Sequence, residues 1–131
     1  MTYAPIALFT YNRADHTQRA VESLLKNAEA KFSDLFIFSD GPKTPEKKAG
    51  VEENRKYIHT ISGFNSVHII EREKNWGLAN SLIAGITEVI NKYGKVIVVE
   101  DDLILSPYFL KFMNDGLEKY KDDDRVSSIS G

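Results

Sequence analysis

Three consecutive carboxylates, Glu100, Asp101 and Asp102, follow the short apolar segment Val96 to Val99. The β-branched residues of this segment are typical of a strand that is buried on both faces. Three acidic side chains at its end would repel one another strongly if they were removed from water without a partner. A divalent cation with a phosphorylated ligand would offset this repulsion, because Mg²⁺ and Mn²⁺ are often held by one or two carboxylates plus substrate phosphates. The alternative is a turn in which the three charges are solvated.

Three other apolar segments also end in polar residues, namely Thr10-Tyr11-Asn12-Arg13, Ser39-Asp40-Gly41 and Glu71-Arg72-Glu73. Ligands of open α/β sheets bind beyond the carboxyl ends of the strands, so the four polar clusters are expected to share one rim. Each cluster alone has an ordinary explanation: Arg13 could be a surface residue, and Asp40 a turn former before glycine. Together they offer a cation, a hydrogen-bond acceptor and metal ligands, which are the groups that a nucleoside diphosphate requires.

The segment Asn75-Trp76-Gly77 precedes an expected helix. Gly77 permits close approach of the backbone, and the free N–H groups of a first helical turn suit an anion. Trp76 could form a platform for a sugar or a base, or could pack beneath the loop.

Strand-like and longer helix-like segments alternate along the chain, which indicates an α/β fold. Strands are expected at residues 6–10, 35–38, 67–70 and 96–99, and residues 126–130 look like the beginning of another strand. Because the sequence ends there, we expect a fragment of a longer protein. An exposed edge at this strand would favour pairing between chains, which predicts a homodimer.

Four helices are expected between these strands. The first is capped by Asp15 and extends to about Lys26. The second starts at Thr44-Pro45, because proline at the first helical position costs no hydrogen bond, and ends at Gly63. The lysine-rich segment 43–48 is interpreted as its solvated start. Val51, Ile58 and Ile61 are the expected buried residues of this second helix.

The third helix is predicted by an apolar stripe and ends near Gly94. Its stripe consists of Leu78, Leu82, Ile86, Val89 and Ile90. The fourth helix opens at Ser106-Pro107. Its expected inward residues are Phe109, Phe112, Met113 and Leu117.

The composition is that of one soluble globular domain. The chain has 131 residues, 42% of them hydrophobic and 27% charged, with a formal net charge of −2. These values give no indication of nucleic-acid binding or of attachment to an anionic membrane. The lack of cysteine excludes disulfides and cysteine nucleophiles. No apolar segment approaches the roughly 20 residues of a membrane span, and there is no secretory signal, so a cytoplasmic protein is expected.

These motifs resemble the N-terminal, nucleotide-binding part of a GT-A-type glycosyltransferase. The opening segment and the Asn75-Trp76-Gly77 motif resemble the family 2 glycosyltransferases. The sequence Val-Val-Glu-Asp-Asp-Leu followed by Pro-Tyr-Phe-Leu is most similar to the N-acetylglucosaminyltransferase I group. The resemblance covers nearly the whole chain. It implies an α/β fold, a GT-A (Rossmann-like) three-layer α/β/α domain with a mainly parallel sheet, in which residues 1–131 form the nucleotide-sugar-binding part.

The resemblance also implies roles for individual residues. Arg13 would meet the nucleotide, Asp40 would read the uracil edge, and Asp102 would ligate Mn²⁺ or Mg²⁺. The full donor-binding set that it implies is Thr10, Asn12, Arg13, Asp40, Arg72, Asn75, Gly77, Glu100 and Asp101. The implied activity is metal-dependent transfer of a sugar from a UDP-sugar donor to an unknown glycan or other acceptor.

No catalytic base is assigned to this chain. His16 and His59 fall on expected helices and His68 inside an expected strand, so they form no plausible base constellation. In enzymes of this type the base and the acceptor-binding half lie beyond residue 131. We therefore expect the isolated chain to be inactive in sugar transfer.

Three alternative functions remain open. A nucleotidyltransferase of related fold is one, although Thr10 to Ala14 contains no glycine and so lacks the usual phosphate loop. A receiver-like Mg²⁺-binding signalling domain is another, although its acidic pair usually follows an early strand. The third is a degenerate domain that keeps the fold without activity.

Overall fold

The computed structural model describes residues 3–119 and 128–130. Its centre is a five-stranded sheet in the order β3-β2-β1-β4-β5, and every neighbouring pair is parallel. The strands are β1 (Ile6–Thr10), β2 (Asp34–Ser39), β3 (Ser66–Glu71), β4 (Val96–Glu100) and β5 (Ser128–Ser130). The expected strands are therefore confirmed to within one residue at either end. For the last strand this holds at residues 128–130, since residues 126 and 127 lie outside the described part of the chain.

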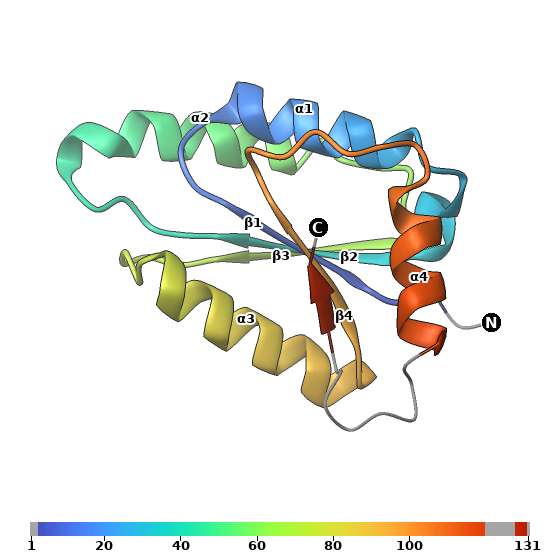
Figure 1. Cartoon of the computed structure of the whole chain (residues 1–131). Helices are drawn as coiled ribbons and strands as arrows, with labels where there is room; N and C mark the ends of the chain where they lie inside the picture. The colour runs from blue at the N-terminus through green and yellow to red at the C-terminus, as the bar shows by residue number, and fades with distance from the viewer. Residues whose placement is uncertain (1–2, 120–127, 131) are drawn as a thin grey trace.

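Helices cover both faces of the sheet (Figure 1). The helical segments are α1 (Ala14–Leu25), η1 (Ala28–Phe32), η2 (Pro45–Lys47), α2 (Lys48–Ile58), α3 (Leu78–Tyr93) and α4 (Phe109–Lys119). Helices α1, α2 and α4 pack on one face, and α3 packs on the other. This confirms the three-layer α/β/α architecture.

Alternation along β1 separates the two cores. Ile6 and Leu8 belong to the core beneath α1, α2 and α4, whereas Ala7 and Phe9 face α3. All four side chains are buried, as expected for a central parallel strand that is covered on both faces. The order of the strands places β1 at the centre of the sheet, so the residues that follow it are flanked by the ends of β2 and β4.

Helix α3 approaches the sheet closely at Gly85. A Cβ atom at this position would lie 2.7 Å from the Phe9 ring, so the contact requires glycine. The Phe9 ring in turn stacks on Phe38 of β2, with the ring centres 5.0 Å apart. This packing fixes the first turn of α3 beside the carboxyl ends of β1 and β2.

The structure corrects two predicted helix boundaries. Helix α1 begins at Ala14, so Arg13 and not Asp15 occupies the cap position. Asp15 lies in the first turn, where a carboxylate interacts favourably with the helix dipole, and pairs with Arg19 at 3.1 Å. Helix α2 ends at Ile58 rather than at Gly63, which has a φ of 100° in the loop before β3.

Two predicted core residues face solvent instead. Leu78 is 58% exposed because it begins α3 at the rim, where no strand lies beneath it. Phe112 is 72% exposed, and the inward stripe of α4 is formed by Leu110, Met113 and Leu117. Helical periodicity places residue 112 about 200° from residue 110, on the opposite side of the helix. In the described ranges, no helix is long and apolar enough to cross a membrane.

Candidate functional site

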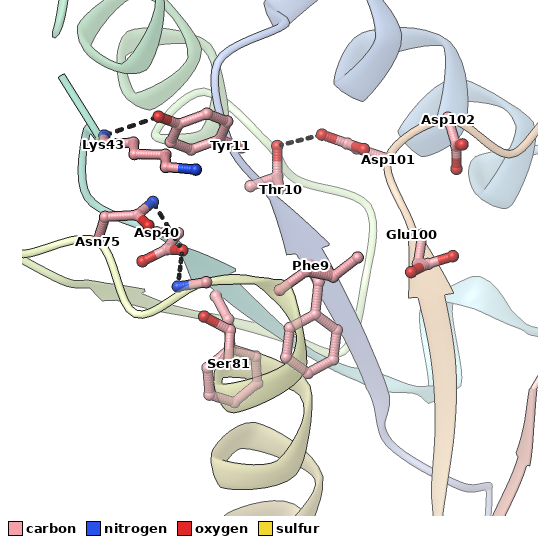
Figure 2. A pocket seen from close by; sticks show the side chains of 13 residues that line it. Phe9, Thr10, Tyr11, Asp40, Lys43, Asn75, Ser81, Glu100, Asp101 and Asp102 are labelled. Carbon is pink, nitrogen blue, oxygen red and sulfur yellow. Dashed lines mark hydrogen bonds between the residues drawn. The ribbon is translucent and has the colours of Figure 1, made fainter. Parts of the chain in front are cut away.

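A cavity of about 490 Å³ opens at the carboxyl ends of β1, β2 and β4, beside the first turn of α3 (Figure 2). It is lined by Phe9, Thr10, Tyr11, Phe38, Asp40, Lys43, Asn75, Gly77, Leu78, Ser81, Glu100, Asp101 and Asp102. The structure thus brings together seven of the ten predicted site residues, namely Thr10, Asp40, Asn75, Gly77, Glu100, Asp101 and Asp102.

The lining combines apolar and acidic side chains. The stacked rings of Phe9 and Phe38 and the exposed side chain of Leu78 provide apolar surface. The end of β4 provides Glu100, and the turn after it provides Asp101. Figure 2 shows Lys43, Asp40 and Asn75 on one side of the cavity and the three consecutive carboxylates on the other, with Thr10 between them. A ligand with an aromatic ring and a charged group would meet both kinds of side chain in this cavity.

Asp101 is a half-buried carboxylate at the acidic end. Its Oδ2 atom accepts a hydrogen bond from the Thr10 hydroxyl at 3.3 Å. Burial raises the pKa of Asp101, while the Tyr11 backbone and the Thr10 hydroxyl oppose the rise and the neighbouring charge of Asp102 adds to it. The charged form is therefore disfavoured here, and a cation in the cavity would stabilise it.

Thr10 is itself held by buried polar groups. The Asn54 side chain, fully buried on α2, donates from Nδ2 to the Thr10 hydroxyl at 2.9 Å and to the Tyr11 carbonyl at 3.3 Å. The hydroxyls of Thr10 and Thr17 are 2.6 Å apart. Asn54 was not predicted from the sequence, because its partners Thr10 and Tyr11 lie at the end of β1, more than 40 positions earlier in the chain. Its only signal was a polar residue within the buried stripe of a helix.

Asp40 has a different environment from the β4 carboxylates. Its Oδ1 atom accepts hydrogen bonds from the backbone N–H groups of Gly41 at 2.9 Å and Trp76 at 2.8 Å. Its Oδ2 atom accepts from the Gly77 N–H at 3.0 Å and the Asn75 Nδ2 at 3.2 Å. Asp40 therefore fixes the loop that leads into α3. Gly77, with a φ of 83°, suits this turn because L side chains rarely adopt such a backbone.

Arg55 supports the same edge of the sheet from α2. Its guanidinium donates to the Ser39 hydroxyl at 3.0 Å, to the Arg72 carbonyl at 2.7 Å, and to the carbonyls of Ser39 and Asp40 at 3.3 Å each. These bonds join the ends of β2 and β3. The sequence offered no signal for this role, because a lysine- and arginine-rich helix is usually solvated.

Three predicted donor-binding residues, Asn12, Arg13 and Arg72, do not line the cavity. Arg13 is exposed at the start of α1, and Arg72 lies over the ring of Trp76 at 4.0 Å. Lys43 was predicted to lie in a solvated helix start. In the structure Lys43 precedes the first turn of η2 and lines the cavity. The other lining residues that were not predicted are Phe9, Tyr11, Phe38, Leu78 and Ser81.

The acidic end fits a divalent cation only in part. Within residues 3–119 and 128–130, no group of three or more Asp, Glu or His residues lies together in a way that could hold a metal ion. Among these residues, no hydrogen bond or ion pair occupies the carboxylates of Glu100 and Asp102. This donor set suits Mg²⁺ or Mn²⁺ bound by one or two carboxylates, with the remaining ligands supplied by water and phosphate.

Comparison with known proteins identifies the family. Residues 6–129 match the family model described as Glycosyl transferase family 2, so the chain belongs to that family. A crystal structure of S. aureus TarS matches with a TM-score of 0.62 and 17% sequence identity, over 91% of this chain and 20% of the TarS chain. At this identity the match shows the GT-A fold alone. The chain thus spans about one fifth of the TarS chain. No curated protein matches the chain.

Family membership bears on the alternative functions that the sequence left open. It confirms the predicted resemblance to family 2 and argues against the receiver-like alternative. Neither comparison favours the N-acetylglucosaminyltransferase I group over other members of the fold. That closer resemblance stays a prediction.

Proposed function

We propose that this chain is the donor-binding part of a metal-dependent glycosyltransferase that takes a sugar from a UDP-sugar and passes it to a glycan or other acceptor. The observation that carries the proposal is the cavity at the strand ends of a family 2 chain, lined by both apolar and acidic side chains. The exposed side chain of Leu78, together with the largely buried rings of Phe9 and Phe38, offers apolar contact to the planar base. The acidic end, with Glu100, Asp101 and Asp102, suits a diphosphate that arrives with a divalent cation.

Within this proposal, Asp102 binds the metal, and Glu100 and Asp101 face the ribose and the sugar. When bound, Mn²⁺ or Mg²⁺ supplies a Lewis acid that stabilises the departing nucleoside diphosphate. The protein contributes the orientation of its carboxylates, because Asn54 holds Thr10 and Thr10 donates to Asp101. We further propose N-acetylglucosamine or another common hexose as the sugar, and inversion as the stereochemical course, on the resemblance alone.

Catalysis requires a base that we assign to another part of the enzyme. None of the three histidines lines the cavity: His16 lies in α1, His59 pairs with Glu71 at 3.0 Å, and His68 stacks on Phe36. Loss of a general base typically lowers rates by about 10²–10⁴-fold. The 131-residue chain should therefore bind the donor without measurable sugar transfer.

The preference for uracil rests on Asp40. Its carboxylate lines the cavity but already accepts four hydrogen bonds from the Gly41 backbone and the 75–77 loop. A carboxylate has about four acceptor positions, so a uracil N–H would have to replace one of these bonds. Asn75, whose amide donates to Asp40 at 3.2 Å, is the most easily displaced partner because that contact is the longest.

Calorimetry with the 131-residue chain tests the proposal. We expect UDP to bind with Mn²⁺ more tightly than ADP or GDP, and to bind weakly after the metal is removed with a chelator. Equal affinity for the three nucleotides would contradict the uracil assignment but leave nucleotide binding intact. No binding of any nucleotide in the presence of Mn²⁺ or Mg²⁺ would contradict the proposed function itself.

A further inference from the structure

Lys43 occupies a defined position at the mouth of the cavity. It lies between the end of β2 and η2, and its backbone N–H donates to the Tyr11 hydroxyl at 2.8 Å. Tyr11 follows β1, so this bond ties together two segments that extend beyond neighbouring strands. Figure 2 shows the Lys43 side chain extending from this anchor toward Thr10, at the centre of the cavity. The backbone N–H of Lys43 is thus bonded, and the residue is exposed to water.

Lys43 is the only described lining residue with a basic side chain. The acidic lining residues are Asp40, Glu100, Asp101 and Asp102. No ion pair to Lys43 is present among the described residues, and Asp40 is already satisfied by four N–H donors. The ammonium group is therefore available to a ligand, and it lies across the cavity from the metal-binding end.

The negative charge of a bound diphosphate would attract a lysine at this position. Free UDP, the leaving group of the proposed transfer, has a terminal phosphate and carries more negative charge than one divalent cation neutralises, so a second positive group strengthens its binding. Lysine serves this purpose as a compact point charge with three donors on a flexible stem. The two arginines predicted to bind the donor do not line the cavity, because Arg13 is exposed at the start of α1 and Arg72 lies against Trp76.

We infer that Lys43 is a donor-binding residue whose ammonium group contacts the phosphates of a nucleoside diphosphate in the cavity, and that Tyr11 is the positioning residue that holds its backbone. The inference rests on the proposed function, since it assumes that the cavity binds a nucleotide. It adds a cation on the wall opposite the metal, so that the diphosphate would be bound from two sides.

Calorimetry of UDP and of uridine, each with Mn²⁺, tests this inference with the variants Lys43→Gln, Lys43→Arg and Lys47→Gln. Lys47 is a matched control, because it is an exposed lysine of the neighbouring η2 turn that does not line the cavity. We expect Lys43→Gln to weaken UDP binding about 10- to 100-fold, the usual range for one hydrogen bond to a charged group. Uridine binding should not change, Lys43→Arg should retain most of the UDP affinity, and Lys47→Gln should behave like the parent chain.

Three results would overturn the inference. They are unchanged UDP affinity in Lys43→Gln, an equal loss in Lys47→Gln, and an equal loss of uridine and UDP affinity in Lys43→Gln. Each of these leaves the proposed function standing, provided that the parent chain binds UDP. If the parent chain binds no nucleotide, the proposed function fails and the inference fails with it. Thermal melting verifies that the variants fold, which is expected because the Lys43 side chain is exposed.

Discussion

Asp40 and the cluster Glu100–Asp102 lie at the same rim of the sheet, but their surroundings differ sharply. The Asp40 carboxylate is 9% exposed and accepts four N–H groups from its own chain. In the cluster, Asp101 accepts one side-chain hydrogen bond, from Thr10, and burial raises its pKa. Asp102 is exposed and accepts no hydrogen bond from any described residue.

This difference separates a carboxylate that the fold supplies with a full set of hydrogen-bond donors from carboxylates that it leaves with few or none. Four N–H donors compensate for the burial of Asp40, so its carboxylate holds the loop at residues 75–77, and a ligand N–H can bind it only by replacing one of these donors. In the cluster only Asp101 has such donors among the described residues, namely Thr10 and the Tyr11 backbone, and the like charges of Asp101 and Asp102 repel one another. The repulsion between these carboxylates remains unfavourable until a cation binds beside them and offsets it. Acidic residues at strand ends can therefore either hold a loop or bind a cation, depending on how many hydrogen-bond donors the fold places around them.

The largest expected effect is on metal-dependent binding. Asp102→Ala should lower UDP affinity in Mn²⁺ by more than about 100-fold, since even the outer partners of metal ligands contribute about 10–100-fold. Stability should change by less than about 0.5 kcal/mol, or rise slightly, because the variant removes an exposed charge that repels Asp101. Calorimetry and urea denaturation measure the two quantities.

The control for this variant is Asp115→Ala. Asp115 is an exposed carboxylate of α4 that pairs with Lys111 at 2.8 Å, away from the cavity lining. It should bind UDP like the parent chain. If Asp102→Ala retains normal Mn²⁺-dependent UDP binding, Asp102 is not the metal ligand, and that role passes to Asp101 or Glu100.

The second expected effect is on folding. Asp40→Ala should lower the free energy of unfolding by about 3 kcal/mol, because it removes an acceptor from the N–H groups of Gly41, Trp76 and Gly77 and from the Asn75 amide. One hydrogen bond to a charged group contributes about 1.5–3 kcal/mol, and water replaces part of this at the rim.

Urea denaturation measures the loss caused by Asp40→Ala, and amide hydrogen exchange locates it. Exchange should accelerate at Trp76 and Gly77 and remain slow in the central strand β1. An Asp40→Ala variant as stable as the parent chain, with unchanged exchange in this loop, would remove the distinction between the two rim carboxylates.

The smallest expected effect is on the pH dependence of stability. It concerns a third carboxylate, Asp34, at the opposite end of β2. Hydrogen bonds from Ser66, Asn65 and Tyr93 hold the pKa of Asp34 below its ordinary value of 3.8. Because the folded pKa is lowered, Asp34 stabilises the fold above about pH 4, and this contribution disappears as the pH falls through the folded pKa. Asp34 is only partly buried, so screening by water keeps the effect small, about 0.5 kcal/mol.

Asp34→Asn should therefore be slightly less stable than the parent chain at pH 7, and the difference should shrink below pH 4. Urea denaturation at several pH values measures this. UDP affinity should not change, because Asp34 lies at the amino end of β2, away from the cavity. A stability difference between Asp34→Asn and the parent chain that grows as the pH falls would contradict a lowered pKa of Asp34.

The local sequence predicted the secondary structure well where apolar periodicity was strong. The strand at Ile6–Thr10 was predicted at its observed bounds, and the helix that ends at Gly94 follows from a stripe and a terminating glycine. The inward position of Phe112 was wrong, because Leu110 begins the buried stripe instead. Leu110 and Phe112 are both apolar but lie on opposite sides of the helix. The sequence alone does not show which side packs against the sheet.

The sequence by itself determined the strands, the parallel three-layer class and the rim on which polar residues gather, because these depend on short-range periodicity and on the rule that parallel strands end together. Only the tertiary structure decided what each rim residue does. The partners of Asp40 come from residues 75–77, and the donor that holds Thr10 comes from Asn54 on α2. Hydrogen-bond partners so far apart in the chain leave no local pattern, so the fold alone separates the satisfied carboxylate from the open ones and brings Lys43 to the cavity.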